Sequence, residues 1–251
     1  MRALFSVVLI TKNAGQHLSK CLDSCLFADE IVLVDSGSQD DTLTIAKNYG
    51  ARIIEQEWLG FGPQKQFAVE QASNDWVLCL DADEWISEKL SLSINKILEN
   101  PEFFAYRFPR CNKFMGKFLR HGEGYPDQSL RLFHRQKARW SDDKVHECVL
   151  TSSQVGQLYG DLMHESGEDI ALYLSKQNSY TSLQAMALHA RGKTAGMGKM
   201  LFSPLLRFIK FYFIKQGFRD GIPGLVHIVI GCMNAFVKYA KLRELSRLEG
   251  Q

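Results

Sequence analysis

The first part of the sequence alternates short apolar runs with segments of helical periodicity. The apolar runs are Phe5–Ile10, Ile31–Val34 and Trp76–Leu80, and Ala51–Ile54 is predicted to be a further short strand. Continuous apolar, β-branched runs are typical of strands buried on both faces of a sheet. Between them, apolar residues recur every three or four positions, and Pro63 stands where a helix would begin. Repeated strand–helix–strand units predict an α/β fold with a parallel sheet wound by right-handed crossovers.

Polar residues follow three of these strands directly. They are Thr11-Lys12-Asn13, Asp35-Ser36-Gly37-Ser38 and Asp81-Ala82-Asp83-Glu84. Ligands of wound α/β sheets bind beyond the carboxyl ends of the strands. The sequence therefore predicts a binding site built from these three segments.

The carboxylates among these residues suggest two kinds of ligand. Asp81 and Asp83 provide the oxygen ligands that Mg²⁺ or Mn²⁺ prefers, although a turn also favours Asp. Asp35 could accept hydrogen bonds from a nucleobase or ribose, while Ser38 and Asp40 could cap a helix. Neither GxGxxG nor GxxxxGK[ST] occurs, so a dinucleotide-binding or P-loop protein lacks its main sequence support.

Composition separates the chain into a body and a tail. Residues 1–185 carry 19 Lys and Arg against 25 Asp and Glu, a net charge of −6. Residues 186–251 carry 11 against 3, a net charge of +8. A basic tail indicates an anionic partner, or else a solvated basic helix face.

The overall composition excludes several protein classes. With 45% hydrophobic and 23% charged residues, the chain is not of a disordered, collagen-like or disulfide-scaffold type. The six cysteines are scattered without a CxxC pair, which fits reduced thiols in the cytosol. Charges break the apolar stretches short of the ~18 residues that span a bilayer, so we expect no transmembrane helix.

Three ordered motifs carry a family resemblance. The segments SVVLITKN, IVLVDSGSQDDT and WVLCLDADEW together resemble glycosyltransferase family 2 enzymes of the GT-A fold. The segments GFGPQKQFA, YPDQSLRLF and KVHECV resemble the branch that transfers glucose onto the lipopolysaccharide inner core. The resemblance implies a GT-A-type, Rossmann-like domain with a mixed, mainly parallel sheet and a C-terminal helical extension. The implied boundaries are 1–168 for the catalytic domain, with a donor half to about residue 100, and 169–251 for the extension.

The resemblance also implies roles for individual residues. Those that would hold the donor nucleotide are Thr11, Asn13, Asp35, Lys65, Asp81 and Asp83. A divalent cation, Mg²⁺ or Mn²⁺, would be bound by Asp83 and His146, with His164 as a rival histidine. Arg131 and Glu147 would lie near the diphosphate or the acceptor. Asp127 would be the general base, in a PD pair that replaces the ED pair of many relatives.

The segment Lys199–Lys215 is both basic and aromatic. Its cations Arg207 and Lys210 lie three residues apart, with Phe208 and Phe211 beside them. Such a helix could lie in the interface of an anionic membrane, or pack on the catalytic domain with its cationic side chains spread over apolar surface. We favour the membrane, because the implied acceptor is a lipid. The following apolar segment, Ile222–Met233, is too short to span a bilayer.

The resemblance as a whole implies a metal-dependent, inverting glycosyltransferase. It would move glucose from UDP-glucose to a heptose of the lipopolysaccharide inner core, as a peripheral protein on the cytoplasmic face of the inner membrane. Alternatives are another nucleotide sugar, a polyprenyl-phosphate acceptor, or a catalytically silent membrane-binding protein on the same fold. Nucleic acid is not an expected partner, because the tail resembles no recognition module.

Overall fold

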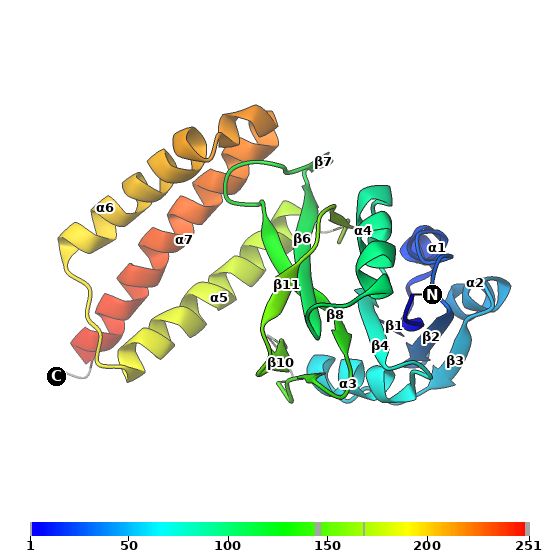
Figure 1. The fold of residues 1–251 in the computed structure, drawn as a ribbon. Coiled ribbons are helices and arrows are strands. Elements are labelled where there is room, and N and C mark those ends of the chain that lie inside the picture. Colours follow the sequence, from blue (N-terminus) through cyan, green and yellow to red (C-terminus); the bar gives the residue numbers. More distant parts are fainter. Residues whose placement is uncertain (1, 144–146, 168, 249–251) are drawn as a thin grey trace. The chain divides into compact units, whose positions relative to one another are not determined.

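A computed structural model describes residues 2–143, 147–167 and 169–248 (Figure 1). The chain divides into two compact units. The first contains Met1–Arg110 and Asp127–Glu165, and the second contains Cys111–Pro126 and Ser166–Gln251.

The predicted strands and helices at the start of the chain are present in the first unit. These elements are β1 (Phe5–Thr11), α1 (Gly15–Asp23), β2 (Glu30–Asp35), α2 (Thr42–Asn48), β3 (Arg52–Glu55), α3 (Phe61–Gln71) and β4 (Trp76–Asp81). The four strands are parallel in the order β3-β2-β1-β4, which confirms the predicted parallel arrangement of this half. Thr11 is in register with Asp35, so the ends of β1 and β2 lie side by side.

The sheet continues beyond β4 with antiparallel pairs, in the order β4-β8-β6-β12-β5. The remaining elements that belong wholly or mainly to this unit are β5 (Glu84–Ile86), α4 (Glu88–Glu99), β6 (Ala105–Phe114), β8 (Asp127–His134), β9 (Ala138–Trp140), β10 (Val149–Thr151), β11 (Val155–Gln157) and β12 (Leu162–His164). Because β8 runs opposite to β4, it begins at the edge of the sheet where β4 ends. The sheet is therefore mixed, as the GT-A resemblance implies.

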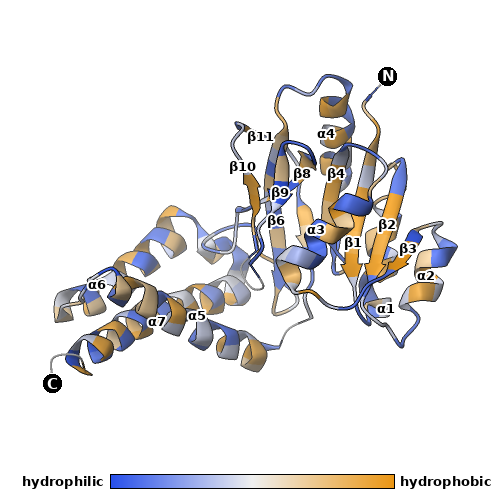
Figure 2. Cartoon of the chain, turned by 90° about the horizontal axis from the view of Figure 1, so that it is seen from below, coloured by the Kyte–Doolittle hydropathy of each residue, from blue (hydrophilic) through white to orange (hydrophobic). Residues whose placement is uncertain are grey.

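Helices cover both faces of this sheet (Figures 1 and 2). Side chains alternate along a strand, so Val7 and Leu9 enter the core beneath α1 and α4, whereas Val8 enters the core beneath α3. Figure 2 shows β1, β2 and β4 as largely hydrophobic strands, in keeping with burial from both sides. The two cores hold the carboxyl ends of the strands in place.

Glu30 joins three segments at the opposite edge of the sheet. Its carboxylate accepts hydrogen bonds from Ser6 Oγ, Arg52 Nη2 and the backbone N–H of Ser73 at 2.5, 2.8 and 2.8 Å. Burial alone would raise the pKa of Glu30, but these hydrogen bonds lower it from 4.5 to about 2. A group whose pKa is lowered on folding stabilises the fold above its unfolded pKa.

We therefore expect Glu30→Gln to remove a pH-dependent part of the stability. The lowered pKa corresponds to about 3 kcal/mol at pH 7, which the wild-type protein loses as the pH falls from 4.5 towards 2. Urea unfolding of wild type, Glu30→Gln and the exposed-site control Glu57→Gln across this pH range measures it. A wild-type pH dependence that persists in Glu30→Gln would contradict this assignment.

The second unit is helical apart from a short hairpin. Its elements are β7 (Lys117–Phe118), α5 (Ile170–Ala190), α6 (Met197–Phe208), a π-helical turn η1 (Ile209–Ile214), a 3₁₀ turn η2 (Gly217–Asp220) and α7 (Gly221–Leu248). Asp169 caps α5 by accepting a hydrogen bond from the backbone of Leu172, at the point where the sequence turns helical.

The compact units differ from the predicted division at residue 168. Residues 111–126 group with the C-terminal helices, not with the sheet. The buried carboxylate of Asp220 accepts hydrogen bonds from the backbone N–H groups of Arg120 and His121, at 2.9 and 2.8 Å. Gly122 and Gly217 let the two backbones approach closely, because a Cβ atom on Gly122 would lie 3.1 Å from the Gly217 Cα atom.

The expectation that no helix is long and apolar enough to span a membrane is wrong. Within the described residues, one helical segment, Gly217–Leu248, meets that criterion by length and composition. The sequence interpretation ended the apolar helix at Met233, but α7 continues to Leu248. Asn234 lies inside this helix, and its polar side chain donates a hydrogen bond to Gln177 Oε1 at 2.7 Å within the unit.

Candidate active site

A cavity of about 540 Å³ opens at the carboxyl ends of β1 and β4. Its lining side chains come from these strand ends, the segment that enters α3, β12 and the segment before β10: Ile10, Thr11, Lys12, Trp58, Phe61, Lys65, Asp81, Asp83, Glu147 and His164. It lies at the edge of the sheet that the sequence predicts for a ligand.

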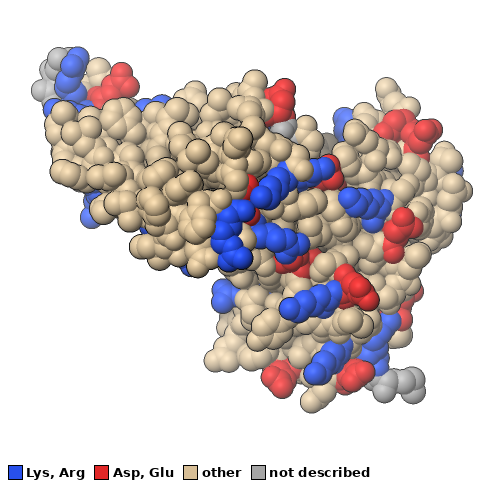
Figure 3. All heavy atoms as spheres, turned by 90° about the horizontal axis from the view of Figure 1, so that it is seen from above, with Lys and Arg blue, Asp and Glu red and all other residues tan. Residues whose placement is uncertain are grey.

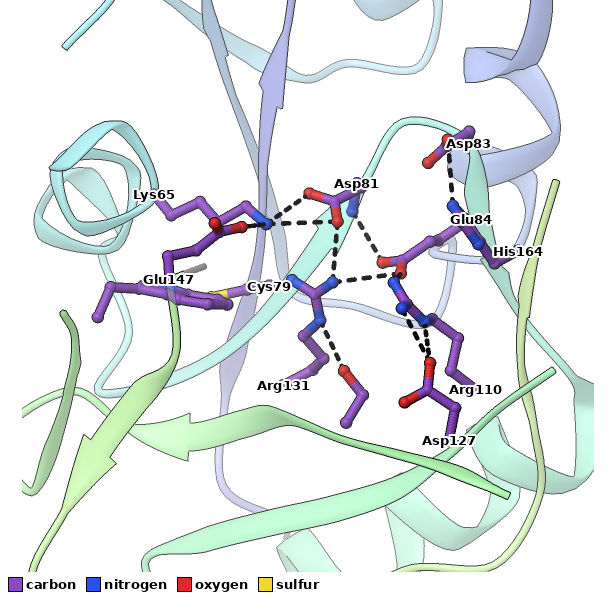
Figure 4. Close-up of polar contacts among 12 residues, drawn as sticks. Lys65, Cys79, Asp81, Asp83, Glu84, Arg110, Asp127, Arg131, Glu147 and His164 are labelled. Atoms are coloured by element: carbon purple, nitrogen blue, oxygen red, sulfur yellow. Dashed lines mark hydrogen bonds and ion pairs between the residues drawn. The ribbon is translucent and has the colours of Figure 1, made fainter. Parts of the chain in front are cut away.

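Lys65 is the cation on the wall of the cavity formed by α3. Its Nζ lies 3.0 Å from Asp81 Oδ1 and 2.9 Å from Glu147 Oε1, and it sits 4.9 Å from the centroid of Trp140 (Figure 4). The side chain is buried because α3 packs against the sheet and directs it towards the end of β4. Two carboxylates and an aromatic ring together hold this ammonium group inside the site.

Arg131 is a second buried cation that pairs with Asp81. Its Nη2 donates to Asp81 Oδ2 at 2.8 Å and to Glu84 Oε1 at 3.2 Å, and its Nε donates to Ser129 Oγ at 3.1 Å. Burial alone would raise the pKa of Asp81, but Arg131 and Lys65 hold it well below its usual range. Asp81 therefore stays ionised. The guanidinium of Arg131 is buried among these partners, and its predicted contact with a diphosphate stays a prediction.

Asp83 and His164 meet at one end of the cavity. His164 Nε2 lies 3.3 Å from Asp83 Oδ2, and both side chains are partly exposed (Figure 4). The backbone N–H of Glu165 donates to the Asp83 carbonyl oxygen at 3.0 Å, which ties β12 to this turn. The predicted ligand His146 lies outside the described residues. In the part of the chain that the structure describes, no group of three His, Cys, Asp or Glu side chains is arranged to hold a metal ion.

Asp127, the predicted general base, begins β8. It pairs in register with Arg110 of β6, whose Nε and Nη2 lie 2.9 and 2.8 Å from Asp127 Oδ2. Arg110 Nη1 also lies 3.4 Å from Glu84 Oε1, so a chain of ion pairs joins Asp127 to the Asp81–Arg131 pair (Figure 4). The side chain of Asp127 remains partly exposed at the sheet edge.

The other predicted donor residues join the loops that follow β1 and β2. Asp35 is buried and accepts hydrogen bonds from Thr11 Oγ1, Ser38 Oγ and the backbone N–H groups of Gly37 and Ser38. Asn13 has a φ of 52° and accepts a hydrogen bond from the backbone N–H of Gln39 through Oδ1. Thr11 lines the cavity, whereas nucleotide contacts of Asp35 and Asn13 stay predictions.

The structure places the predicted membrane residues in the second unit. Arg207 forms an ion pair with Glu123, through its Nε at 3.0 Å and through Nη2. Phe208 and Phe211 are half-buried, whereas Lys210 is exposed. The exposed apolar side chains of this segment are others, among them Leu205, Leu206, Ile209, Phe213 and Ile214.

Sequence reasoning missed several residues of the site. Arg110 is an ordinary charged residue in the sequence, and its pairing with Asp127 and Glu84 arises only from pairing between strands. Trp58 and Phe61 form an exposed edge-to-face pair, with centroids 4.9 Å apart, on one wall of the cavity. The signal available in the sequence was a pair of aromatic residues, Trp58 and Phe61, at the point where the chain enters α3.

Comparisons with known proteins agree with this arrangement. A profile of Glycosyl transferase family 2 matches residues 6–154. The lipopolysaccharide core biosynthesis glycosyltransferase LpsC of Rhizobium meliloti is 30% identical, over 98% of this chain and 94% of LpsC. An uncharacterized glycosyltransferase of Rickettsia typhi is 32% identical, over 96% of this chain and 87% of that protein. Among solved structures, residues 1–349 of S. aureus TarS in complex with UDP-GlcNAc share the fold, with a TM-score of 0.51 at 14% identity, over 99% of this chain and 92% of that one.

Proposed function

Because the chain belongs to glycosyl transferase family 2, we propose that it transfers glucose from UDP-glucose to a heptose of the lipopolysaccharide inner core. The family makes the chain a glycosyltransferase. The choice of acceptor is supported by full-length similarity to a relative named for lipopolysaccharide core biosynthesis. The choice of donor is supported by the cavity and by the motifs that resemble the glucose-transferring branch.

The charge balance of the site is the observation that carries the proposal. Four cations, which are Lys12, Lys65, Arg110 and Arg131, face five carboxylates. These are Asp81, Asp83, Glu84, Asp127 and Glu147. The site described here thus has an excess of negative charge, and a doubly charged diphosphate would be repelled from it. A divalent cation corrects the balance and makes the donor an acceptable ligand.

The residues at the end of the cavity fit such a cation. Asp83 supplies a carboxylate and His164 an imidazole nitrogen, and two protein ligands leave coordination positions for diphosphate oxygens. A bound Mg²⁺ or Mn²⁺ would act as a Lewis acid on the leaving diphosphate, an effect worth several kcal/mol. His146 stays a predicted further ligand.

The chain's own residues account for the remaining chemistry. Lys65 would exchange a carboxylate partner for the diphosphate and donate charge-assisted hydrogen bonds to it. Arg131 keeps Asp81 ionised and oriented towards the donor. Asp127 would accept the proton of the acceptor hydroxyl as that oxygen attacks the anomeric carbon from the face opposite the diphosphate, which inverts the configuration. Arg110 fixes the orientation of this carboxylate.

The acceptor implies a place of action. A lipopolysaccharide core is built on a lipid, so the enzyme would act as a peripheral protein on the cytoplasmic face of the inner membrane. The net charge of +8 over residues 186–251 supports contact with an anionic surface.

The test is a calorimetric titration with UDP-glucose, in the presence of Mg²⁺ or Mn²⁺ and after chelation with EDTA. We expect binding that needs the cation and that Asp83→Ala abolishes, because Asp83 is the partly exposed carboxylate of the Asp83–His164 pair. Asp142→Ala, which removes an exposed carboxylate elsewhere, is the matched control and should bind as wild type does. Parallel titrations with UDP-galactose and UDP-N-acetylglucosamine determine the sugar, and a folded protein that binds no UDP-sugar would contradict the proposal.

A further inference from the structure

We infer that the exposed apolar face of α6, η1 and α7 inserts into an anionic lipid bilayer. The residues of this lipid-facing surface differ from the predicted Phe208 and Phe211. The inference rests on the second unit alone and does not depend on which sugar is transferred.

Helix α7 carries large apolar side chains on its outer face. They recur every three or four residues, the spacing of a single helical stripe: Ile222, Leu225, Val229, Met233 and Phe236. The stripe lies within residues 221–237, a stretch that contains no Lys, Arg, Asp or Glu. In a water-soluble helical unit, a stripe of this kind would be covered by a neighbouring element.

Helix α6 and the turn after it extend this surface. The exposed apolar residues here are Leu201, Phe202, Leu205, Leu206, Ile209, Phe213 and Ile214. Since α6 packs along α7, the two stripes belong to one helical pair. Figure 3 shows one face of the helical unit, at the left of the picture, almost without charged side chains.

Polar side chains line part of the space between α7 and α5. A cavity of about 110 Å³ between the helices is lined by Glu123, Tyr173, Gln177, Arg207, His227, Asn234 and neighbouring residues. Tyr173 Oη and His227 Nε2 form a hydrogen bond of 3.1 Å, and Asn234 donates to Gln177 at 2.7 Å. The unit thus encloses several polar groups between α5 and α7, while large apolar side chains of α6 and α7 remain on its surface.

The buried apolar cluster of this unit is correspondingly small. Its buried members are Ala185, Ala195 and Leu242, whereas the sheet of the first unit has two extensive clusters. Contiguous exposed apolar surface of this extent marks a contact with a membrane or another protein.

Basic side chains beside this surface favour a lipid bilayer over another protein as its partner. Lys199, Lys210 and Lys215 lie on α6, on η1 or directly after it, and two of them stack on aromatic rings, Lys199 over Tyr239 at 5.3 Å and Lys210 over Phe211 at 5.2 Å. Figure 3 shows Lys and Arg side chains gathered at the border of the uncharged face. An apolar surface bordered by lysines matches hydrocarbon beneath anionic headgroups.

The test measures binding of the full-length protein to phosphatidylethanolamine–phosphatidylglycerol vesicles by sedimentation. Leu206→Ser combined with Ile222→Ser is expected to lower the partition coefficient at least ~10-fold, because both side chains leave water on binding. The control Leu26→Ser with Leu92→Ser replaces two leucines of similar exposure in the first unit and should change binding less than ~2-fold. Lys210→Gln with Lys215→Gln should weaken binding ~5-fold per lysine at low salt.

Two further results make the outcome decisive. Wild-type binding should persist in 0.5 M NaCl, because salt does not screen apolar insertion. Brominated lipids should quench the tryptophan fluorescence that the substitution Leu206→Trp adds to the protein. The inference would be overturned if the Leu206/Ile222 variant bound vesicles as well as wild type does. It would also be overturned if the wild-type protein were a dimer without vesicles and the two substitutions made it a monomer. UDP-glucose titration of the variant should match wild type, so a failed donor site and a failed membrane surface give different results.

Discussion

Asp127→Asn is expected to lower kcat by ~10²–10⁴ while leaving the affinity for UDP-glucose unchanged. Asp127 begins β8 at the sheet edge that carries the donor residues, and Arg110 holds its Oδ2 from the neighbouring strand. Asn retains one oxygen that can accept the Arg110 hydrogen bonds, so the local structure should persist while the proton acceptor is lost. The measurement is steady-state turnover with UDP-glucose and a heptose-terminated core acceptor, beside a titration of UDP-glucose.

The control for this prediction is Asp142→Asn. Asp142 is a solvent-exposed carboxylate that pairs with Arg139, so the substitution makes the same chemical change at an ion pair that does not line the cavity. Its turnover should equal that of wild type. Near-normal turnover of a folded Asp127→Asn protein would mean that another group accepts the proton, and Glu147 in the cavity would be the next to test.

Arg131→Met is expected to destabilise the fold by about 3–5 kcal/mol, the usual cost of removing one partner of a buried ion pair. The substitution leaves Glu84, which is 0% exposed, with Arg110 at 3.4 Å as its cation, and leaves Asp81 with Lys65. The methionine side chain fills a similar volume, so the loss reports mainly on the uncompensated carboxylates. Urea unfolding at pH 7 measures it, with Arg139→Met as a matched control at an exposed pair, where the cost should stay below about 1 kcal/mol.

Two additional measurements separate charge from packing. Glu84→Gln in the Arg131→Met background should recover part of the lost stability, because one buried charge is removed. The folded-state pKa of Asp81 lies below its ordinary value of 3.8, so this contribution is present above that pH and is lost as the pH falls. The stability difference between wild type and Arg131→Met should therefore shrink in acid, and a difference independent of pH would contradict the electrostatic explanation.

Much of the fold could be predicted from the sequence because its determinants are local. The runs Phe5–Ile10 and Trp76–Leu80 place apolar side chains on both faces of the strand. That pattern alone indicates buried parallel strands. Polar residues at strand ends, such as Thr11 and Asp81, then follow from the geometry of a wound sheet, whose strands end at one edge. These elements needed no knowledge of which residues meet.

The sequence could not reveal partners that depend on strand register and on packing between distant segments. Arg110 faces Asp127 because β6 and β8 pair in one particular register, and His164 reaches Asp83 because β12 lies beside β5. Both pairs join segments whose contact is decided by the closure of the whole sheet.

The sequence by itself determined the α/β order, the edge of the sheet where the cavity opens and the residue types found there. Tertiary structure decided which cation neutralises which carboxylate, that residues 111–126 group with the C-terminal helices, and which face of α6 and α7 stays exposed. The physical reason is that periodicity records how a segment alternates between buried and exposed positions. It does not record which apolar side chains a neighbour covers: along α7, Ile228 and Leu242 are buried, whereas Ile222 and Val229 stay exposed.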